Sequence, residues 1–326
     1  MKSLKIVGIG GGTGLPVVLR GLVAENHVDV SAVVTVSDNG GSSGRLRESF
    51  GTPAVGDLRN CLVALSGGGP AIGDLFQHRF AAGDVDGHAL GNLIITALYQ
   101  KTGSLRGAVE AASDMLMLHG KVLASTEIPA TLCARFADGS VIRGESQLSA
   151  TDERIEEVWL DPQNPDPGPG VLEAIETADA IVLAPGSLYT SLVPNLLVGG
   201  VAESIRRSRA VTILVCNLMT QPGETDGFSA SDHLRVLQAC LGKDGIDFCI
   251  VNVTAEPESG IGYRISGSLP VVADLDEIEM LGVIPVAADI FSSTDNKVRH
   301  DPAKLARQIV AIAQGEVQPW GAVRAA

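Results

Sequence analysis

Short apolar runs alternate with helical patterns along most of the chain. The first two runs, residues 4–9 and 30–36, are separated by a helical pattern over residues 15–24. This order predicts a βαβ unit, because parallel strands are joined by a crossover that is usually helical. Further strands are expected at residues 180–184, 211–217, 247–253 and 283–286, with helices at 171–177, 232–240 and 302–313. The pattern predicts a Rossmann-like α/β fold, with a mostly parallel sheet and helices on both faces.

One stretch, from about residue 120 to residue 162, does not show this alternation of strands and helices. The runs 132–136 and 141–144 flank Asp138-Gly139, a dipeptide that supplies the positive φ angles of a hairpin turn. The following segment, residues 162–169, contains too many prolines for a helix or a central strand and predicts a connector. We therefore expect a single domain over residues 1–326 with a small antiparallel hairpin insertion at about 120–162.

Composition and charge narrow the classes of function. The chain has 326 residues, 45% of them hydrophobic, and a formal net charge of −14 without a dense basic run. Nucleic acid is therefore not an expected partner, because affinity for its backbone needs clustered Lys and Arg. A strand is predicted directly after Met1-Lys2, and no apolar run reaches spanning length, so we expect a cytoplasmic protein without membrane insertion.

The cysteines and histidines do not indicate a metal site. The five cysteines are widely spaced and form no C-x-x-C pair, which is typical of reduced core thiols. The histidines lack metal-ligand spacing, so no zinc site is expected.

A glycine-rich loop, GIGGGTG at residues 8–14, joins the first predicted strand to the first helix. Its candidate binding residues are Gly10, Gly11, Gly12, Thr13 and Gly14. Glycines let backbone N–H groups approach a phosphate, and a helix N-terminus adds the positive end of its dipole. The spacing is neither the dinucleotide fingerprint nor a Walker loop. The alternative is a tight turn that only packs the helix on the strand.

A second loop, SDNGGSSGR, follows the second predicted strand. Asp38 alone would suit the ribose of NAD, but its neighbours are typical of a phosphate site. The candidates here are Asp38, Asn39, Ser42, Ser43 and Arg45. A plain surface loop is the alternative.

Two further motifs, GDLRN at residues 56–60 and GHALGN at residues 87–92, add Asp57, Asn60 and Asn92. Asp57 has the chemistry to coordinate hydrated Mg²⁺ or to accept a proton, and equally to cap a helix. Asp38 and Asp57 are the candidate catalytic residues if the protein is an enzyme.

Polar loops also follow the strands predicted at 180–184 and 211–217. The candidates after the first of these strands are Gly186, Ser187, Tyr189, Thr190, Ser191 and Asn195. Those after the second are Asn217, Thr220, Gln221, Gly223 and Glu224. Neither loop carries the G-x-S-x-G elbow of a serine hydrolase. Hydroxyl-rich turns before a helix suit an anion or a sugar.

Near the carboxyl end, Arg299 is placed to reach a diphosphate and Tyr263 to stack on a base. Solvated side chains are the alternative for both. Micromolar binding needs about 8 kcal/mol, and one charged hydrogen bond gives about 1.5–3 kcal/mol. Several loops must therefore converge on one ligand, which favours a nucleotide diphosphate conjugate over inorganic phosphate.

The chain resembles the YvcK-type gluconeogenesis factors, within the CofD-like (2-phospho-L-lactate transferase) superfamily. The resemblance covers nearly the whole chain and is carried by GGGTGL, VSDNGGSSGRLR, GDLRN, GHALGNL, APGSLYTSLVPNLLV and CNLMTQPGETDGFSASDH. It implies a UDP-sugar-binding regulatory protein, with UDP-N-acetylglucosamine as the expected ligand, that links gluconeogenesis to cell-wall precursor supply and cell shape in bacteria.

The transferase branch of the same superfamily implies an alternative. There, phospholactate carried on a nucleotide diphosphate is joined to a deazaflavin precursor with magnesium, and Asp38 and Asp57 stand where acidic residues are expected. The long PGSLYTS and NLMTQPGETD stretches match the gluconeogenesis branch better, so we expect binding without turnover. No fixed cofactor is expected beyond Mg²⁺ accompanying a diphosphate. A homodimer and a metabolic-enzyme or cell-wall partner protein are the expected associations.

Overall fold

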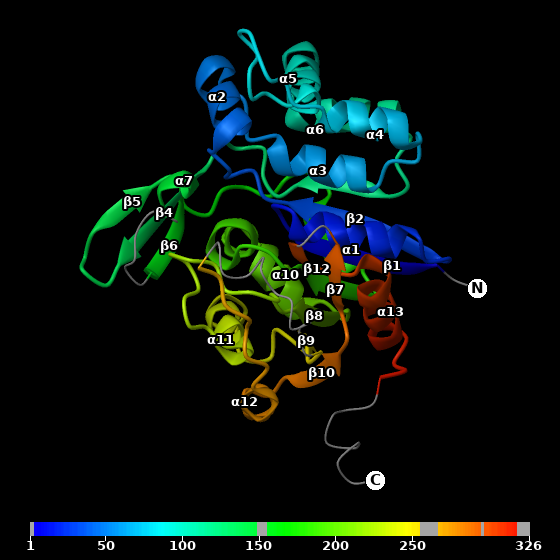
Figure 1. The fold of residues 1–326 in the computed structure, drawn as a ribbon, viewed down its shortest axis with the longest axis vertical. Helices are drawn as coiled ribbons and strands as arrows, with labels where there is room; N and C mark the ends of the chain where they lie inside the picture. The colour runs from blue at the N-terminus through cyan, green and yellow to red at the C-terminus, as the bar shows by residue number, and fades with distance from the viewer. Residues whose placement is uncertain (1–2, 149–154, 255–266, 295–296, 318–326) are drawn as a thin grey trace.

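The computed structural model describes residues 3–148, 155–254, 267–294 and 297–317. Within them, the core of the protein is a seven-stranded sheet whose pairings are all parallel (Figure 1). In spatial order its strands are β10 (Ile284–Ala288), β9 (Phe248–Asn252), β8 (Val211–Val215), β7 (Ala180–Leu183), β1 (Leu4–Gly10), β2 (Val28–Val34) and β3 (Lys121–Ala124). The predicted Rossmann-like α/β fold is confirmed.

Helices cover both faces of this sheet because successive strand residues point to opposite sides. In β1, Ile6 belongs to one buried cluster, whereas Val7 and Ile9 belong to the other. The first face packs against α1 (Gly14–Val23), α3 (Gly56–Ala64), α6 (Leu105–Leu116) and α13 (Pro302–Ala313). The second packs against α8 (Val171–Glu176), α10 (Val201–Arg207), α11 (Ala230–Leu241) and α12 (Leu275–Met280).

A layer of helices is inserted between β2 and β3 and forms the top of the molecule in Figure 1. It contains α3 and α6 together with α2 (Gly41–Phe50), α4 (Pro70–Gln77) and α5 (Leu90–Thr102). Phe76 and Ile95 carry the main hydrophobic core into this layer, since both are fully buried in the same cluster as the sheet residues. The layer therefore shares its core with one face of the sheet.

The antiparallel insertion exists, but its start and size differ from the prediction. It is a three-stranded sheet in the order β5 (Val141–Arg143), β4 (Thr131–Phe136) and β6 (Ile155–Asp161). Residues 121–124, expected within the insertion, instead form β3 and pair with β2. Lys121 is exposed while Val122 and Ala124 are buried. An edge strand of the main sheet and a hairpin strand share this alternation, so the pattern could not separate them.

The strand order reverses between β1 and β7. From β1 the chain proceeds to β2 and β3 on one side, and from β7 to β8, β9 and β10 on the other. Loops after such neighbouring strands leave in opposite directions and open a crevice at the carboxyl edge. Four shorter elements lie around this edge: α7 (Glu145–Leu148), the π-helix η1 (Leu188–Leu192), α9 (Val193–Leu196) and the hairpin β11 (Phe291–Thr294) with β12 (Lys297–His300).

Candidate functional site at the strand-order reversal

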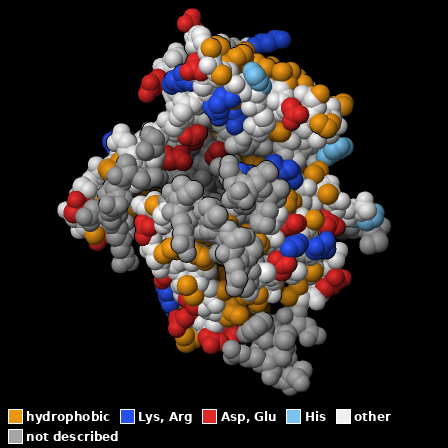
Figure 2. Space-filling model, in the orientation of Figure 1, with side chains coloured by type: hydrophobic (Ala, Val, Ile, Leu, Met, Phe, Trp, Pro, Cys, Tyr) orange, Lys and Arg blue, Asp and Glu red, His pale blue; other side chains and the backbone are white. Residues whose placement is uncertain are grey.

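A crevice of about 680 Å³ lies at the reversal point. Three of the predicted loops line it: Gly12–Gly14 after β1, Pro185–Ser191 after β7, and Asn217–Glu224 after β8, with Arg299 on β12 as a further wall. Figure 2 shows a hollow between α3 and α7 with acidic side chains at its rim. The strand ends thus bring together loops that are far apart in the sequence.

The glycine loop and the turn after β7 are in direct contact. A Cβ on Gly14 would lie 1.8 Å from the carbonyl oxygen of Pro185, and a Cβ on Gly11 would lie 2.5 Å from Asp57 Oδ2. Two carboxamides fix the loop, since Asn195 Nδ2 donates to Gly10 O (3.2 Å) and Asn60 Nδ2 donates to Gly12 O (3.3 Å). The glycines therefore permit a close approach between two binding loops.

The side chain of Glu224 binds the backbone at the first turn of η1. Its carboxylate accepts hydrogen bonds from Tyr189 N (2.6 Å), Thr190 N (3.3 Å) and Ser187 Oγ (2.5 Å). Burial raises the pKa of Glu224, while these donors oppose the rise. The amide groups at this turn are thus already used by the protein and are not free for a phosphate.

The Asn217 side chain bonds both backbone groups of Gly186 in this loop. Its Oδ1 accepts from Gly186 N (2.7 Å), and its Nδ2 donates to Gly186 O (2.6 Å). What the loop still presents to the crevice are the hydroxyl oxygens of Ser187 and Thr190. A hydroxyl whose hydrogen is donated elsewhere can only accept, so these oxygens suit ligand hydroxyl or amide N–H groups such as those of a sugar.

The N-terminus of α1 carries no side-chain cap. Its N-cap residue, Thr13, makes no side-chain capping bond, and the first turn contains no acidic residue. The opening N–H groups of an α-helix lack intrahelical partners and favour an anion. Arg299 is exposed on the crevice wall and adds a full positive charge. These two features make this part of the crevice electropositive.

Two carboxyl groups near the crevice have displaced pKa values. Burial raises the pKa of Asp57 to about 6, although the Gly12 N–H donates to it and opposes the rise. Burial also raises the pKa of Glu145 to about 8, and the charges of Asp38 and Asp57 add to the rise. Glu145 is therefore protonated at neutral pH.

A count of hydrogens also indicates a proton on this group of residues. Glu145, Thr190, Ser187 and Glu224 form a chain of three hydrogen bonds. The two hydroxyls supply only two hydrogens, and a carboxylate at each end supplies none. The third hydrogen must therefore come from a proton on one of the two end carboxyl groups, and burial raises the pKa of both.

The acidic residues do not make a metal site by themselves. Among the described residues, no group of three or more His, Cys, Asp or Glu side chains is arranged to hold a metal ion. Mg²⁺ commonly takes one or two carboxylates together with phosphate oxygens of a ligand. The described side chains fit only that shared mode, with Asp57 as the nearest carboxylate to the glycine loop.

Ser42, Ser43 and Arg45 of the second loop lie in α2, within the helical layer. Ser42 Oγ lies 3.0 Å from His88 Nδ1 and accepts from Asn92 Nδ2 (3.1 Å), while Arg45 Nη2 donates to Asp86 O (2.6 Å). Ser43 packs close to Gly56 at the start of α3. The loop before α5 and α5 itself thus hold polar groups of α2, while Ser43 and Asp38 lie beside Gly56, next to Asp57.

The remaining predicted site residues lie in different parts of the structure. Gln221 lines the crevice, whereas Thr220 pairs with Leu269 through its backbone N–H and its Oγ1. Gly223 N–H donates to Asp226 Oδ2 (2.6 Å) in a turn. The other placements can be stated together: Asp38 and Asn39 lie between the crevice and the α2 group, Tyr189 is buried in the core, and Tyr263 lies outside the described residues.

Two residues that line the crevice were not predicted from the sequence. Glu145 lies on α7, in the antiparallel insertion, and no motif surrounds it in the sequence. His300 Nε2 lies 3.1 Å from Cys216 O, and burial lowers the pKa of His300 to about 4. In the sequence, the position of His300 next to Arg299 is the signal that links it to the site. His300 is a neutral anchor that ties β12 to the end of β8.

Fold and crevice together define an α/β protein with a polar crevice at a strand-order reversal. The family model described as 2-phospho-L-lactate transferase CofD matches residues 6–291. The chain is 43% identical to the gluconeogenesis factor of Bacillus subtilis (strain 168), over 94% of this chain and 97% of that protein. It is also 43% identical to the gluconeogenesis factor of Listeria innocua, over 94% of this chain and 95% of that protein.

A solved structure agrees with these matches. The crystal structure of protein BH3568 from Bacillus halodurans superposes with a TM-score of 0.92 at 40% identity, covering 95% of this chain and 100% of that chain. The chain belongs to the CofD family, in its gluconeogenesis-factor branch. The resemblance seen in the sequence motifs is confirmed. Within the described part of the chain, no helix has the length and apolar character needed to cross a bilayer.

Proposed function

We propose that the protein is a cytoplasmic regulator that binds a nucleotide-linked sugar, with UDP-N-acetylglucosamine as the expected ligand. The diphosphate lies at the N-terminus of α1 beside Arg299, and the sugar lies against Ser187 and Thr190. Binding of this ligand couples gluconeogenesis to the supply of cell-wall precursor and thereby to cell shape. No turnover is required.

The observation that carries the proposal is the division of donors and acceptors within the crevice. The uncapped N-terminus of α1 and the exposed Arg299 favour an anion, whereas the amides of the β7 turn are already used by Glu224 and Asn217. An anionic group fits the first part and a hydroxyl-rich group fits the second. A sugar diphosphate carries both kinds of group, but inorganic phosphate carries only the first.

A thermal-shift screen of UDP- and GDP-linked sugars, followed by calorimetry, tests the proposal. A ligand that binds only the native state raises the melting temperature as its concentration rises. We expect UDP-N-acetylglucosamine to raise it more than UDP, since UDP lacks the sugar. Absence of heat with every nucleotide conjugate, with the protein folded, would overturn the proposal.

A CofD-like phospholactate transferase is the second candidate, and the environment of Asp57 favours it. A carboxyl with a pKa of about 6 beside the glycine loop is suited to accept a proton near neutral pH. Asp38 lies close enough to influence it. Magnesium-dependent release of nucleotide with a deazaflavin acceptor, lost in Asp57→Ala, would support this enzyme. Ligand that stays intact for hours would support the regulator.

A further inference from the structure

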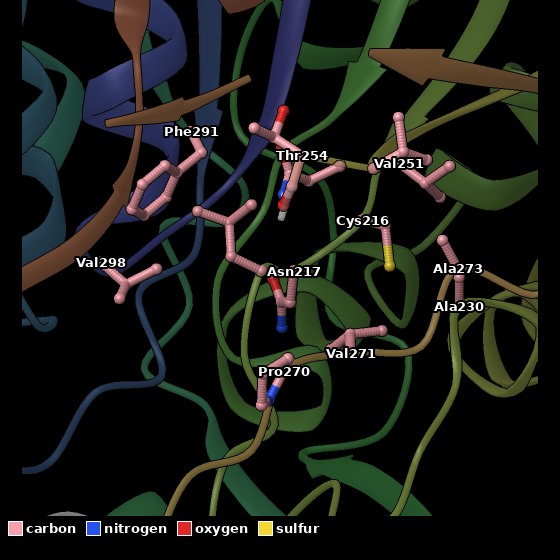
Figure 3. Close-up of a pocket in the computed structure, with 13 residues that line it drawn as sticks. Cys216, Asn217, Ala230, Val251, Thr254, Pro270, Val271, Ala273, Phe291 and Val298 are labelled. Atoms are coloured by element: carbon pink, nitrogen blue, oxygen red, sulfur yellow. The ribbon is translucent and has the colours of Figure 1, made fainter. Parts of the chain in front are cut away.

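A second cavity, of about 430 Å³, adjoins the crevice beyond the ends of β8 and β9 (Figure 3). The two hollows have Asn217, Leu218 and Val298 in common as walls. The two hollows are therefore neighbours, close enough for one extended ligand to contact both.

The walls of this cavity are mostly apolar. Val251 and Val271 line it, and Phe291 and Val298 stand together on one side, opposite Ala273 (Figure 3). Small-molecule sites are typically apolar hollows of this size with a few polar groups that orient the ligand. An aromatic ring beside valine side chains suits a flat, largely apolar ring.

Two carboxamides supply the polar groups. Asn252 Nδ2 donates to Thr254 O (3.3 Å), and Asn252 Oδ1 accepts from Ile290 N (3.3 Å). Asn217 is similarly bonded once at each end to Gly186. Since a carboxamide has two N–H hydrogens and two lone pairs, each side chain retains one donor and one acceptor. Their complement is a ring edge with both C=O and N–H groups.

The β11–β12 hairpin connects the two hollows. Phe291 lines the cavity, Arg299 lines the crevice, and Val298 lines both. Because Ser292 and Arg299 are paired in this hairpin, one rigid element contacts both parts of an extended ligand.

We propose that this cavity takes the nucleoside end of the ligand, with the base beside Phe291 and its polar edge at Asn217 and Asn252. The inference rests on the proposed nucleotide-sugar function and locates the part of that ligand which the crevice leaves unassigned. The diphosphate then spans from the Asn217 wall to Arg299 and α1.

Calorimetry on the full chain tests the assignment with UDP-N-acetylglucosamine and inorganic pyrophosphate as probes. Ala273→Phe fills the cavity from its rim, and Ala303→Phe, at an exposed position of α13, is the matched control. We expect Ala273→Phe to weaken nucleotide-sugar binding at least tenfold and to leave pyrophosphate binding within twofold of wild type. Ala303→Phe should change neither.

A second variant keeps the test decisive if Ala273→Phe fails to fold. Phe291→Ala should weaken the nucleotide sugar several-fold without altering pyrophosphate binding, whereas Phe50→Ala, at an exposed site of α2, should not. Nucleotide-sugar affinity within twofold of wild type in the folded cavity variants would overturn the nucleoside site while the proposed function stands. Failure of wild type to bind any nucleotide would remove both.

Discussion

Ser187 Oγ lies 2.5 Å and 2.6 Å from the two carboxylate oxygens of Glu224, a residue 37 positions later in the chain. This contact joins the loop after β7 to the loop after β8 across the crevice. It also places a carboxylate where the sequence suggests a phosphate. The loop after β7 is consequently better suited to hydroxyl groups than to an anion.

Removal of this carboxylate should destabilise the protein. Glu224→Ala leaves the Ser187 hydroxyl and the Tyr189 and Thr190 amides without their acceptor, and each unsatisfied buried group costs about 1–3 kcal/mol. Denaturant unfolding should therefore show a loss of at least about 2 kcal/mol. Glu224→Gln, which retains one acceptor oxygen, should lose less. Glu279→Ala, on the exposed face of α12, is the control, and an equal loss there would contradict the expectation.

Arg299 should contribute to affinity and not to stability. It is exposed on the crevice wall, so Arg299→Ala removes a charged donor without opening the core. Because one hydrogen bond to a charged group is worth about 1.5–3 kcal/mol, nucleotide-diphosphate affinity should fall about tenfold to a hundredfold. Calorimetry measures the change. Arg307→Ala, also exposed but on α13, should bind like wild type; equal affinity in both variants would exclude the assigned role.

Much of the architecture could be predicted from the sequence because parallel strands and amphipathic helices have distinct periods. The helix expected over residues 302–313 coincides with α13, and Asp301 caps it through the N–H groups of Ala303 and Lys304. β3 could not be assigned, since four residues with alternating burial suit either sheet. Strand order is set by long-range packing, which local pattern does not encode.

The candidate site could be predicted less completely. Loops after β1, β7 and β8 were expected to meet, because carboxyl ends of parallel strands share one edge. The loop after β2 was expected there too; Ser43 and Asp38 lie beside Gly56, whereas Ser42 is bonded to His88 and Asn92. Glu145 could not be found, because its role depends on an antiparallel sheet folding back onto Thr190.

The stability of the protein should depend on pH through Glu145. Its pKa is raised from 4.5 to about 8, so the folded state holds a proton that the unfolded chain releases between these values. The unfolded state binds fewer protons in this window, and stability therefore falls as pH rises through it. Glu145→Gln removes the titrating carboxyl group and therefore this loss of stability at high pH. Its melting temperature should exceed that of wild type at pH 8.5 by on the order of 5 °C and approach it at pH 4.5.

Glu156→Gln, at an exposed position of β6, is the matched control for this pH dependence. Its melting temperature should follow that of wild type at every pH. A Glu145→Gln variant whose difference from wild type is the same at pH 4.5 and pH 8.5 would show that this carboxyl is not held in its protonated form.

Two glycine-to-alanine substitutions distinguish a glycine that is needed for a close contact between loops from a glycine that only lies within a helix. Gly14→Ala places a Cβ 1.8 Å from Pro185 O, and this backbone oxygen cannot move without displacing the β7 loop. Gly73→Ala, inside α4, meets only Val63 Cγ1 at the ordinary distance of 3.5 Å. Since alanine is favoured over glycine in a helix by about 1 kcal/mol, Gly73→Ala should be neutral or stabilising. Gly14→Ala should lower the melting temperature and weaken nucleotide-sugar binding, both measured by thermal shift. Equal behaviour of the two variants would mean that the contact between the β1 and β7 loops does not shape the crevice.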